Sequence, residues 1–417
     1  MLLLGIPVGY CIGTTSVIAL IIKWGYPSLS FGLIAQMLVY GINNFPILAV
    51  PLFLLTGSIM NVGGVSSRIF NFAGSIVGHI RGGLAHVNVL ASFIFSGMSG
   101  AAAADAAGLG QIEIKAMEDA GYDKEFSCAV TGASATIGPV VPPSVPLVLY
   151  GVLATTSVSR LFIGGIVPGT LMVVALMALC AIIAKKRNYP KGDHFSAQRL
   201  IRAFKKAFFP ILTPVIIIGG IWSGVFTPTE AAGVAALYAL ILGFCYREFK
   251  FTELVSTFRS VSINGSAILT ILACAMIYNS ALTRTQVPEI ITNLLFTISK
   301  DPLIILLLLN ITIFIAGMFM STAETITLFT PLFAPLLPKF GIDPIHFGIV
   351  MVLNLMIGQL TPPFGIVLYV IVRVGNIEFD KLVKACVPFY FPIFVVLLII
   401  IFFPSLVTFL PDLVFGR

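Results

Sequence analysis

Residues 137–149 read IGPVVPPSVPLVL, and residues 357–369 read IGQLTPPFGIVLY. Ile, Gly and a Pro-Pro pair hold the same places in both stretches, 220 residues apart. Each Pro-Pro pair stands in the middle of an apolar segment. Proline lacks the N–H that a helix needs, and the residue before it avoids helical geometry. Each segment is therefore predicted to be a helix broken in two, although a simple kink is the plainer alternative.

Two further apolar stretches have small, polar middles. Residues 84–110 read LAHVNVLASFIFSGMSGAAAADAAGLG, and residues 302–338 read PLIILLLLNITIFIAGMFMSTAETITLFTPLFAPLLP. The same offset of 220 carries Gly97-Met98 onto Gly317-Met318, and the segment 28–43 onto 248–263. We predict two re-entrant hairpins, which must be buried in protein or line a cavity, in two duplicated halves. The alternatives are chance matching of residues common in spans and helix packing through small residues.

The composition limits the class of protein. Of 417 residues, 58% are hydrophobic and only 10% are charged, and the mean hydropathy is +1.05. These values exclude a soluble enzyme, a disordered chain and a soluble domain with one anchor. Continuous apolar runs argue against a β-barrel. The six cysteines form no CxxC motif and are expected to be buried thiols. An all-α polytopic membrane protein remains.

The apolar runs predict nine spans and four surface helices. The start of the chain lacks a basic region before its apolar run, so it is expected to be a first span and not a cleaved signal. The spans are 2–22, 45–62, 127–155, 161–184, 209–226, 229–246, 265–283, 346–373 and 385–411, and the amphipathic surface helices are 28–42, 65–80, 247–263 and 286–299.

The basic residues predict the topology. The chain has a net charge of +7 and a pI near 9.1, and residues 185–208 hold eight Lys/Arg between spans. With the amino terminus in the cytoplasm and both hairpins entering and leaving on one side, 18 of the 24 Lys/Arg face inward. The carboxyl terminus is then periplasmic. A nucleic-acid patch is the weaker reading of 185–208, because stacking aromatics are few.

This threading makes the two copies antiparallel, and inverted repeats are typical of secondary transporters. We expect scaffold spans and arm helices to alternate with a transport region. The expected units are 1–83 (scaffold, first half), 84–184 (transport region, first half), 185–208 (cytoplasmic linker), 209–300 (scaffold, second half) and 301–417 (transport region, second half).

Broken helices expose carbonyls that suit Na⁺ and N–H groups that suit anions. The predicted tips add small and hydroxyl residues, and two acids, Asp105 and Glu324, lie near them. A carboxylate within a membrane is expensive and suggests a site. We favour Glu324 over Asp105, for which capping of nearby N–H groups is a plausible alternative. Glu230 is expected only to begin a helix, capped by Thr227 or Thr229.

Other chemistries find no support in the motifs. The four histidines have no metal-ligand spacing, HExxH is absent, and the chain has no GxxxxGK[ST] loop. No Lys or Arg falls in the middle of either broken span. Transport would have to use an ion gradient, and a carboxylate substrate would be held by N–H groups, hydroxyls and bound Na⁺.

Four stretches in the first half resemble a known family. They read SGMSGAAAADAAGLG (96–110), EIKAMEDAGYDKEF (113–126), TIGPVVPPSVPLVLYGVLA (136–154) and LFIGGIVPGTLM (161–172). They look like the large membrane subunit of tripartite ATP-independent periplasmic (TRAP) transporters, and the resemblance extends over nearly the whole chain. The family's first span usually begins earlier than Met1, so the span at 2–22 is expected to be short or trimmed.

The resemblance implies an ion-transporter-superfamily fold, in which a transport domain of two hairpins and two broken helices moves like an elevator against a scaffold. It implies Na⁺-coupled import of an organic acid, chiefly sialic acid or a C4-dicarboxylate, across the bacterial inner membrane. The implied cofactor is Na⁺. The implied partners are a small four-span membrane subunit, expected as a separate chain, and a periplasmic substrate-binding protein.

The resemblance also implies site residues. Phe364 stands where the first copy has Ser144, so the symmetry is imperfect there. The first Na⁺ site would comprise Ser96, Gly97, Ser99, Gly138, Val141 and Pro142; the second, Gly317, Met320, Thr322, Gly358 and Thr361; the substrate site, Ser99, Ala101, Asp105, Ser144, Ser321, Thr322 and Glu324.

Three alternatives stay open at this point. A plain Na⁺/carboxylate symporter or exporter of the same fold would need no binding protein. An intramembrane enzyme could use Asp105 and Glu324 as an acid pair, although no nucleophile–base spacing accompanies them. A channel would carry ions far faster than a carrier turns over.

Overall fold

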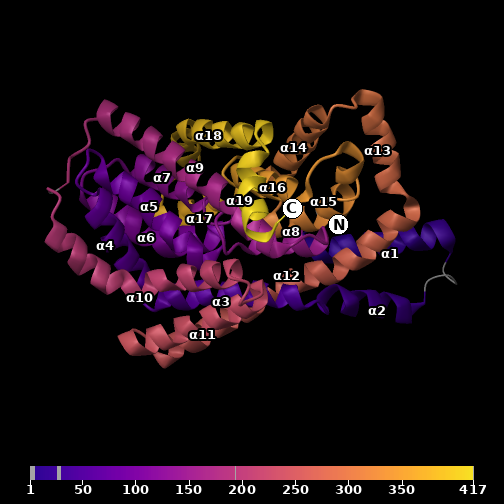
Figure 1. The fold of residues 1–417 in the computed structure, drawn as a ribbon, viewed down its shortest axis with the longest axis horizontal. Helices are drawn as coiled ribbons and strands as arrows, with labels where there is room; N and C mark the ends of the chain where they lie inside the picture. The colour runs from indigo at the N-terminus through magenta and orange to yellow at the C-terminus, as the bar shows by residue number, and fades with distance from the viewer. Residues whose placement is uncertain (1–4, 26–29, 193, 417) are drawn as a thin grey trace.

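The computed structural model describes residues 5–25, 30–192 and 194–416. Within these ranges the chain is helical, with one isolated antiparallel bridge between Arg81 and Lys191 (Figure 1). The start of the predicted span 2–22, the start of the segment 28–42, Asp193 of the linker and Arg417 lie outside the described residues.

The first half follows the predicted order. Its leading helices are α1 (Val8–Trp24), α2 (Phe31–Ile42), the short 3-10 turn η3 (Phe45–Leu48), α3 (Ala49–Val62) and α4 (Val65–Val77). A second group follows, made of α5 (Gly83–Ser99), α6 (Ala102–Asp119), α7 (Lys124–Ala135), α8 (Val145–Leu153) and α9 (Val158–Lys186).

The second half contains the same kinds of element in a similar order. Its leading helices are α10 (Ala197–Trp222), α11 (Pro228–Tyr246), α12 (Phe251–Thr285) and α13 (Val287–Ile298). The second group is α14 (Pro302–Phe319), α15 (Thr322–Phe333), the 3-10 turn η4 (Leu337–Phe340), α16 (Pro344–Gln359), α17 (Ile366–Gly375), α18 (Phe379–Phe402) and α19 (Ser405–Phe415).

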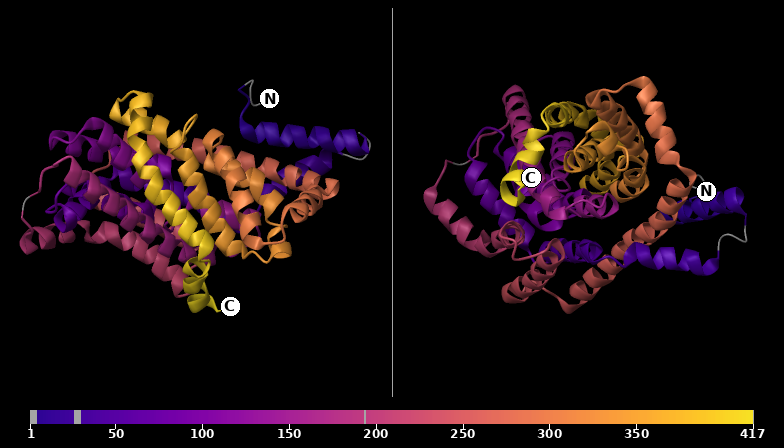
Figure 2. Two further views of the ribbon diagram at one scale, coloured as in Figure 1. Left: turned by 90° about the horizontal axis from the view of Figure 1, so that it is seen from above. Right: turned by 45° about the vertical axis from the view of Figure 1, so that its right-hand side comes forward.

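Helices of the two leading groups pack on one another. α1, α2 and α3 each contact α12, while α11 contacts both α3 and α10. In Figure 1 these elements form the lower part of the molecule, and α14, α16, α18 and α19 lie above them. The left view of Figure 2 places α1, in indigo, and α19, in yellow, on opposite sides of the molecule.

The two second groups interlock. α6 of the first half packs on α17 of the second, and α8 packs on α15. The Tyr150 hydroxyl donates to the carbonyl oxygen of Pro344 at 2.7 Å, and a Cβ placed on Gly348 would lie 2.3 Å from the Tyr150 ring. Because an aromatic ring packs directly against a glycine, α8 and α16 approach closely at the centre of the core.

Three predicted boundaries are wrong. The surface helix 247–263 and the span 265–283 are one helix, α12, because a single Gly265 costs a helix only about 1 kcal/mol and does not end it. The predicted span 385–411 begins at Phe379 and stops at Phe402. Phe403 leaves helical geometry (φ −122°, ψ 74°) before Pro404, as expected for a residue that precedes proline.

The linker is shorter than predicted. α9 runs to Lys186 and α10 begins at Ala197, so the basic residues of 197–208 belong to the helix that continues as the next span. The connection is tied to the α6–α7 turn, where Tyr189 and Arg187 donate to Asp123 at 2.6 and 2.7 Å. These hydrogen bonds, led by that of Tyr189, lower the pKa of the Asp123 carboxyl.

Seven segments in the described part of the chain are long and apolar enough to cross a membrane. Six of the nine predicted spans are among them, because α1 has only 17 residues and the two Pro-Pro spans are each split. The seventh segment is α14, which belongs to the second predicted hairpin. The chain is a multi-pass membrane protein.

Candidate ion and substrate site

The first tip lies between α5 and α6. Gly100 ends α5 in the left-handed region (φ +62°) and donates its N–H to Ser96 O at 3.3 Å, and Ala101 is extended before α6. A Cβ on Gly100 would lie 2.4 Å from the carbonyl oxygen of Pro143. Only glycine combines this φ with so close an approach, so the sequence SGMSGA fixes the shape of the tip.

The first break lies between α7 and α8. Ser144 caps α8 by accepting the N–H of Leu147 at 3.2 Å, while its own hydroxyl donates to Pro139 O. The N–H of Val145 donates to Gly100 O at 3.3 Å, which docks the tip onto the break. Ser144 is predicted to contact the substrate. In the structure it is fully buried, and its hydroxyl hydrogen-bonds to the backbone.

Asp105 joins the tip to the break. Its carboxylate is 2% exposed, and one oxygen accepts the hydroxyl of Ser99. Its other oxygen, Oδ2, has no hydrogen-bond partner among the described residues. A Cβ on Gly138 would lie 2.4 Å from Oδ2, so the carboxylate rests against the backbone of the break. Two predicted Na⁺-site residues, Ser99 and Gly138, therefore meet at one buried carboxylate.

Neighbouring helices seal this first half-site. A Cβ on Gly57 of α3 would lie 2.8 Å from Ser99 Cα, and one on Gly97 would lie 2.6 Å from Pro214 Cβ of α10. On the far side, added Cβ atoms on Gly165 and Gly169 of α9 would lie 2.2 Å from Val140 O and from the Val141 side chain. Every residue from 131 to 150 is consequently buried.

The second tip lies between α14 and α15. Met320 is extended (φ −123°), and Ser321 and Glu324 form a capping box in which Glu324 accepts the Ser321 N–H at 2.8 Å. Glu324 was predicted as a site carboxylate, and the structure engages it as a helix cap. Glu230 forms the same motif with Thr227, which confirms its predicted structural role.

The second break carries fewer polar contacts and more exposed surface. The N–H groups of Phe364 and Gly365 lie 3.3 and 3.5 Å from Met318 O, which docks this tip as Val145 docks the first. Phe319 and Phe364 are each 54% exposed, and their ring centroids are 6.1 Å apart. Thr361 donates its hydroxyl to Ile357 O at 2.7 Å.

Predicted residues of the second Na⁺ site also come together. A Cβ on Gly358 would lie 2.8 Å from the Gly317 carbonyl carbon, so α14 and α16 touch backbone to backbone. The Gln359 amide donates to the Thr322 hydroxyl. Thr325 holds the position 220 residues after Asp105 and donates to Ser321 O at 2.9 Å. This half-site thus offers hydroxyl and carbonyl oxygens without a free carboxylate among its described residues.

A buried polar network that the sequence analysis did not identify backs the first half-site. Ser134 donates to Asn88 Oδ1 at 2.6 Å, and Ser92 connects Ser134 (3.1 Å) to Glu113 (3.5 Å), which is 1% exposed. In the second half, Asn354 donates to Asn310 Oδ1 at 2.7 Å.

The repeat itself could have revealed these partners. Ser134 and Asn354 are 220 residues apart, and each bonds an asparagine on the first helix of its own tip pair. Glu113 carried a weaker signal, because it stands among other acids in EIKAMED.

The family of the chain follows from a match that covers nearly all of it. Residues 1–406 match the family described as "Tripartite ATP-independent periplasmic transporter, DctM component". The chain belongs to the DctM family of TRAP transporter large permeases. The predicted family is thereby confirmed, and it is a family of transporter permeases and not of enzymes.

Relatives of this DctM-family chain have named substrates. It is 44% identical to the sialic acid TRAP transporter large permease protein SiaM of Vibrio cholerae, over 100% of this chain and 97% of SiaM. It is 38% identical to the C4-dicarboxylate TRAP transporter large permease protein DctM of Pseudomonas aeruginosa, over 89% of this chain and 87% of that protein.

The fold has a solved counterpart. The YdaH transporter of Alcanivorax borkumensis superposes with a TM-score of 0.66 over 88% of this chain and 87% of that chain, at 14% sequence identity. This likeness establishes the polytopic helical fold alone.

Proposed function

We propose that this permease imports an organic acid with Na⁺ across the bacterial inner membrane. The observation that carries the proposal is the unpartnered Oδ2 of Asp105, buried where the first tip meets the first break. An uncompensated buried carboxylate is costly, and a hard cation beside it would offset that cost. Helix ends and unwound carbonyls at the same place are typical of coupling-ion sites in secondary transporters.

The donor set of the first half-site fits Na⁺. Asp105 would supply the charge, Ser99 a hydroxyl oxygen, and the break its carbonyl oxygens, of which Pro143 O faces Gly100 at the tip. Bound Na⁺ would supply a positive charge that helps to hold a carboxylate substrate. The second half-site fits Na⁺ less well, because its oxygens are neutral and the Thr322 hydroxyl already accepts a hydrogen bond from Gln359.

The exposed second tip is the proposed entrance for substrate. Met320 is only partly buried and Phe364 is exposed there, whereas their counterparts in the first half, Gly100 and Ser144, are buried. The N-terminal end of α15 carries a positive partial charge that suits an organic anion. We favour sialic acid as substrate, because identity to the sialic acid permease is higher and covers the whole chain.

The topology completes the proposal. We place the amino terminus in the cytoplasm and the carboxyl terminus in the periplasm, with the tips as re-entrant hairpins of inverted repeats. The matched order of α5–α8 and α14–α17 supports this duplication. An elevator motion of α5–α8 and α14–α17 against α1–α4 and α10–α13 would expose the site first to one side of the membrane and then to the other. A four-span small subunit and a periplasmic binding protein are the proposed partners.

Uptake into proteoliposomes tests the proposal. Vesicles would hold the chain with its small subunit and receive radiolabelled sialic acid or succinate, with and without a Na⁺ gradient and binding protein. A membrane potential, negative inside, adds about 2.3 kcal/mol per charge per 100 mV to the driving force on Na⁺. Uptake that needs both additions is the expected result.

Other outcomes separate the alternatives. Uptake that needs Na⁺ alone would favour a plain symporter of this fold, and ion flux far above carrier rates would indicate a channel. Equal uptake without Na⁺ would overturn the coupling.

A further inference from the structure

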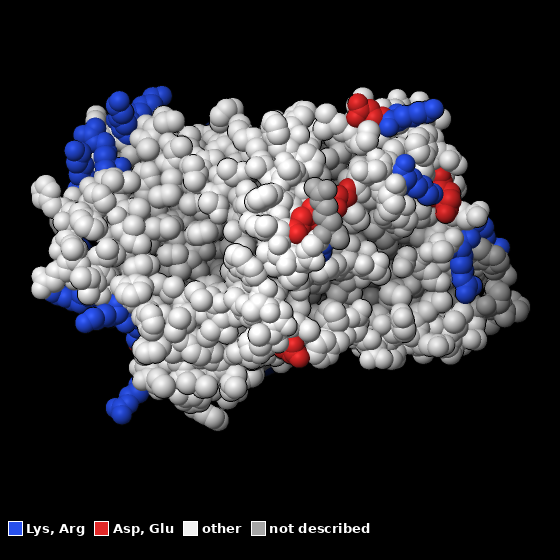
Figure 3. Space-filling model, viewed as in Figure 1, with Lys and Arg blue, Asp and Glu red and all other residues white. Residues whose placement is uncertain are grey.

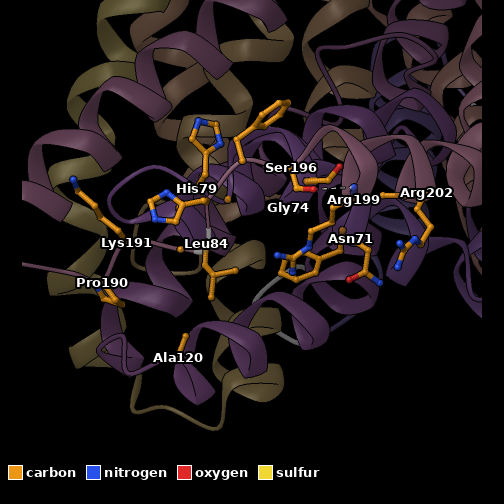
Figure 4. A pocket seen from close by; sticks show the side chains of 18 of the residues that line it. Asn71, Gly74, His79, Leu84, Ala120, Pro190, Lys191, Ser196, Arg199 and Arg202 are labelled. Carbon is orange, nitrogen blue, oxygen red and sulfur yellow. Dashed lines mark hydrogen bonds between the residues drawn. The ribbon is translucent and has the colours of Figure 1, made fainter.

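A cavity apart from both half-sites lies between α4, the α9–α10 connection and α10. Its volume is about 670 Å³. Figure 4 shows basic side chains on more than one side of it, with Lys191 across from Arg199 and Arg202. None of the described residues that line it is Asp or Glu. Its basic and imidazole groups are His79, Lys191, His194, Arg199, Arg202 and Lys206.

The walls of the cavity are held by backbone contacts. The Gly82 N–H donates to Pro190 O at 3.0 Å, beside the bridge between Arg81 and Lys191. A Cβ on Gly192 would lie 2.0 Å from Gly78 O, so the connection rests directly on the end of α4. Lys191 is therefore held against the end of α4 by backbone contacts at the residues on both sides of it.

Two helix N-termini open onto the same cavity. Gly83 begins α5, and Ser196 caps α10 by accepting the Arg199 N–H at 3.4 Å; all three residues line the cavity. The first turns of both helices lack acidic residues. Helix N-termini together with basic side chains make a site for a phosphate-like anion.

Exposed apolar residues stand at the cavity and on α10 beside it; of these, Phe195 lines the cavity. Phe195 (53% exposed) lies with its ring centroid 5.6 Å from that of His79, and Phe204 (42% exposed) packs on Phe72 at 5.8 Å. Ile201 on α10 is 57% exposed. Basic and exposed apolar side chains on one helix are typical of a membrane-interface segment. A free ion would make no favourable contact with these apolar side chains, whereas the acyl chains of a lipid would bury them.

The charge distribution over the surface agrees with this setting. In Figure 3 the Lys and Arg side chains at the end where α4 and α10 lie stand without acidic side chains on the visible face, while the opposite end mixes both signs. A second cavity of about 490 Å³ shares Asn71 and Lys206 with the first, so the groove continues along α4 and α10.

We propose that this cavity binds the phosphate headgroup of an anionic phospholipid, with the acyl chains along the exposed apolar residues of α10. Basic pockets at the cytoplasmic side of membrane helices have the chemistry that recognises such headgroups. The proposal takes its side of the membrane from the proposed topology. It concerns binding and does not depend on Na⁺ coupling.

Thermal stability and native mass spectrometry of the purified full chain test the proposal. Phosphatidylglycerol added to detergent-solubilised protein should raise Tm and give a retained one-to-one adduct, while phosphatidylcholine should give neither. The double variant R202Q/K206Q should bind phosphatidylglycerol about 25-fold more weakly, at about fivefold for each basic group. The matched control is R259Q/K384Q, which removes two exposed basic residues outside both cavities and should bind as the wild type does.

Each other result counts against the proposal. Equal loss in R202Q/K206Q and R259Q/K384Q would mean general surface attraction, and an equal Tm rise with inorganic phosphate would mean a free-anion site. If R202Q/K206Q fails to fold, N71D supplies the test, because it adds a negative charge at an exposed position where the two cavities meet. Retained binding in folded N71D, or no phosphatidylglycerol adduct on the wild type, would overturn the assignment.

Discussion

The two half-sites share a plan but differ in burial and in charge. In the first, the tip and the break are enclosed by α3, α9 and α10, and the buried Asp105 lies at their junction. In the second, Phe319 and Phe364 are exposed, and Thr325 stands where the repeat would place an acid. The difference teaches that two tips of similar plan can present different chemistry. An enclosed carboxylate suits a cation, and an open tip suits a larger substrate that must enter and leave.

Removing the charge of Asp105 is expected to have the largest effect, which is on the Na⁺ affinity of uptake. Asp105→Asn keeps the size of the side chain and its contact with Ser99, but it removes the proposed charge partner of Na⁺. Loss of a hydrogen bond or contact to a charged group costs about 1.5–3 kcal/mol, which is about ten- to hundredfold in Na⁺ affinity. The measurement is uptake as a function of Na⁺ concentration.

The control for Asp105→Asn is Thr325→Val at the equivalent position of the second half. Its hydroxyl serves only its own helix, through Ser321 O, so the Na⁺ dependence should change little. A similar loss in both variants would break the distinction between the half-sites.

The second effect concerns the geometry of the tips. Gly100→Ala should destabilise the protein, because the left-handed backbone alone costs about 1–2 kcal/mol and the new Cβ would meet Pro143 O at 2.4 Å. Met320 holds the equivalent position with an extended backbone, so Met320→Ala should cost clearly less. Thermal unfolding in detergent compares the two. Equal Tm values would show that the first tip is not held by this close approach.

A smaller difference in stability is expected between variants of Ser144 and Phe364, which hold equivalent positions in the two halves. Ser144→Ala removes the cap of α8 and should cost about 1 kcal/mol. Phe364→Ala removes an exposed ring and should change the stability by no more than about 0.5 kcal/mol, while raising the KM of uptake if the open tip receives substrate. A larger Tm loss in Phe364→Ala than in Ser144→Ala would reverse the comparison.

The last comparison, between Glu324 and Glu230, tests whether Glu324 only caps its helix or also serves the site. Glu324→Ala and Glu230→Ala each remove one capping box and one acid at a helix N-terminus, which should cost about 0.3–1 kcal/mol. Uptake should fall at least about threefold further in Glu324→Ala, a difference of about 0.7 kcal/mol, because only Glu324 lies at a tip. Uptake that tracks Tm alike in both variants would assign Glu324 to capping alone.

The sequence predicted the class, the order of the elements and both breaks. Proline and glycine act through their own backbone chemistry, so the Pro-Pro pairs and SGMSG reveal the ends of helices without knowledge of the neighbours. Hydropathy likewise identified the spans. Helix ends without such residues were predicted less well, as at α12, where a change from amphipathic to apolar character did not end the helix.

Only the tertiary structure decided which of the two carboxylates is buried with an oxygen that has no hydrogen-bond partner among the described residues. Sequence spacing placed Asp105 and Glu324 alike beside a tip, and it favoured Glu324. Glu324 folds back onto the Ser321 N–H three residues earlier, which is a local capping box. Tertiary packing decides the surroundings of Asp105, which is enclosed against Gly138 with Oδ2 unpartnered. Composition and backbone chemistry are local and can be read along the chain. Burial and hydrogen-bond satisfaction depend on segments far apart in sequence, here α3, α9 and α10, and are settled only when these helices pack.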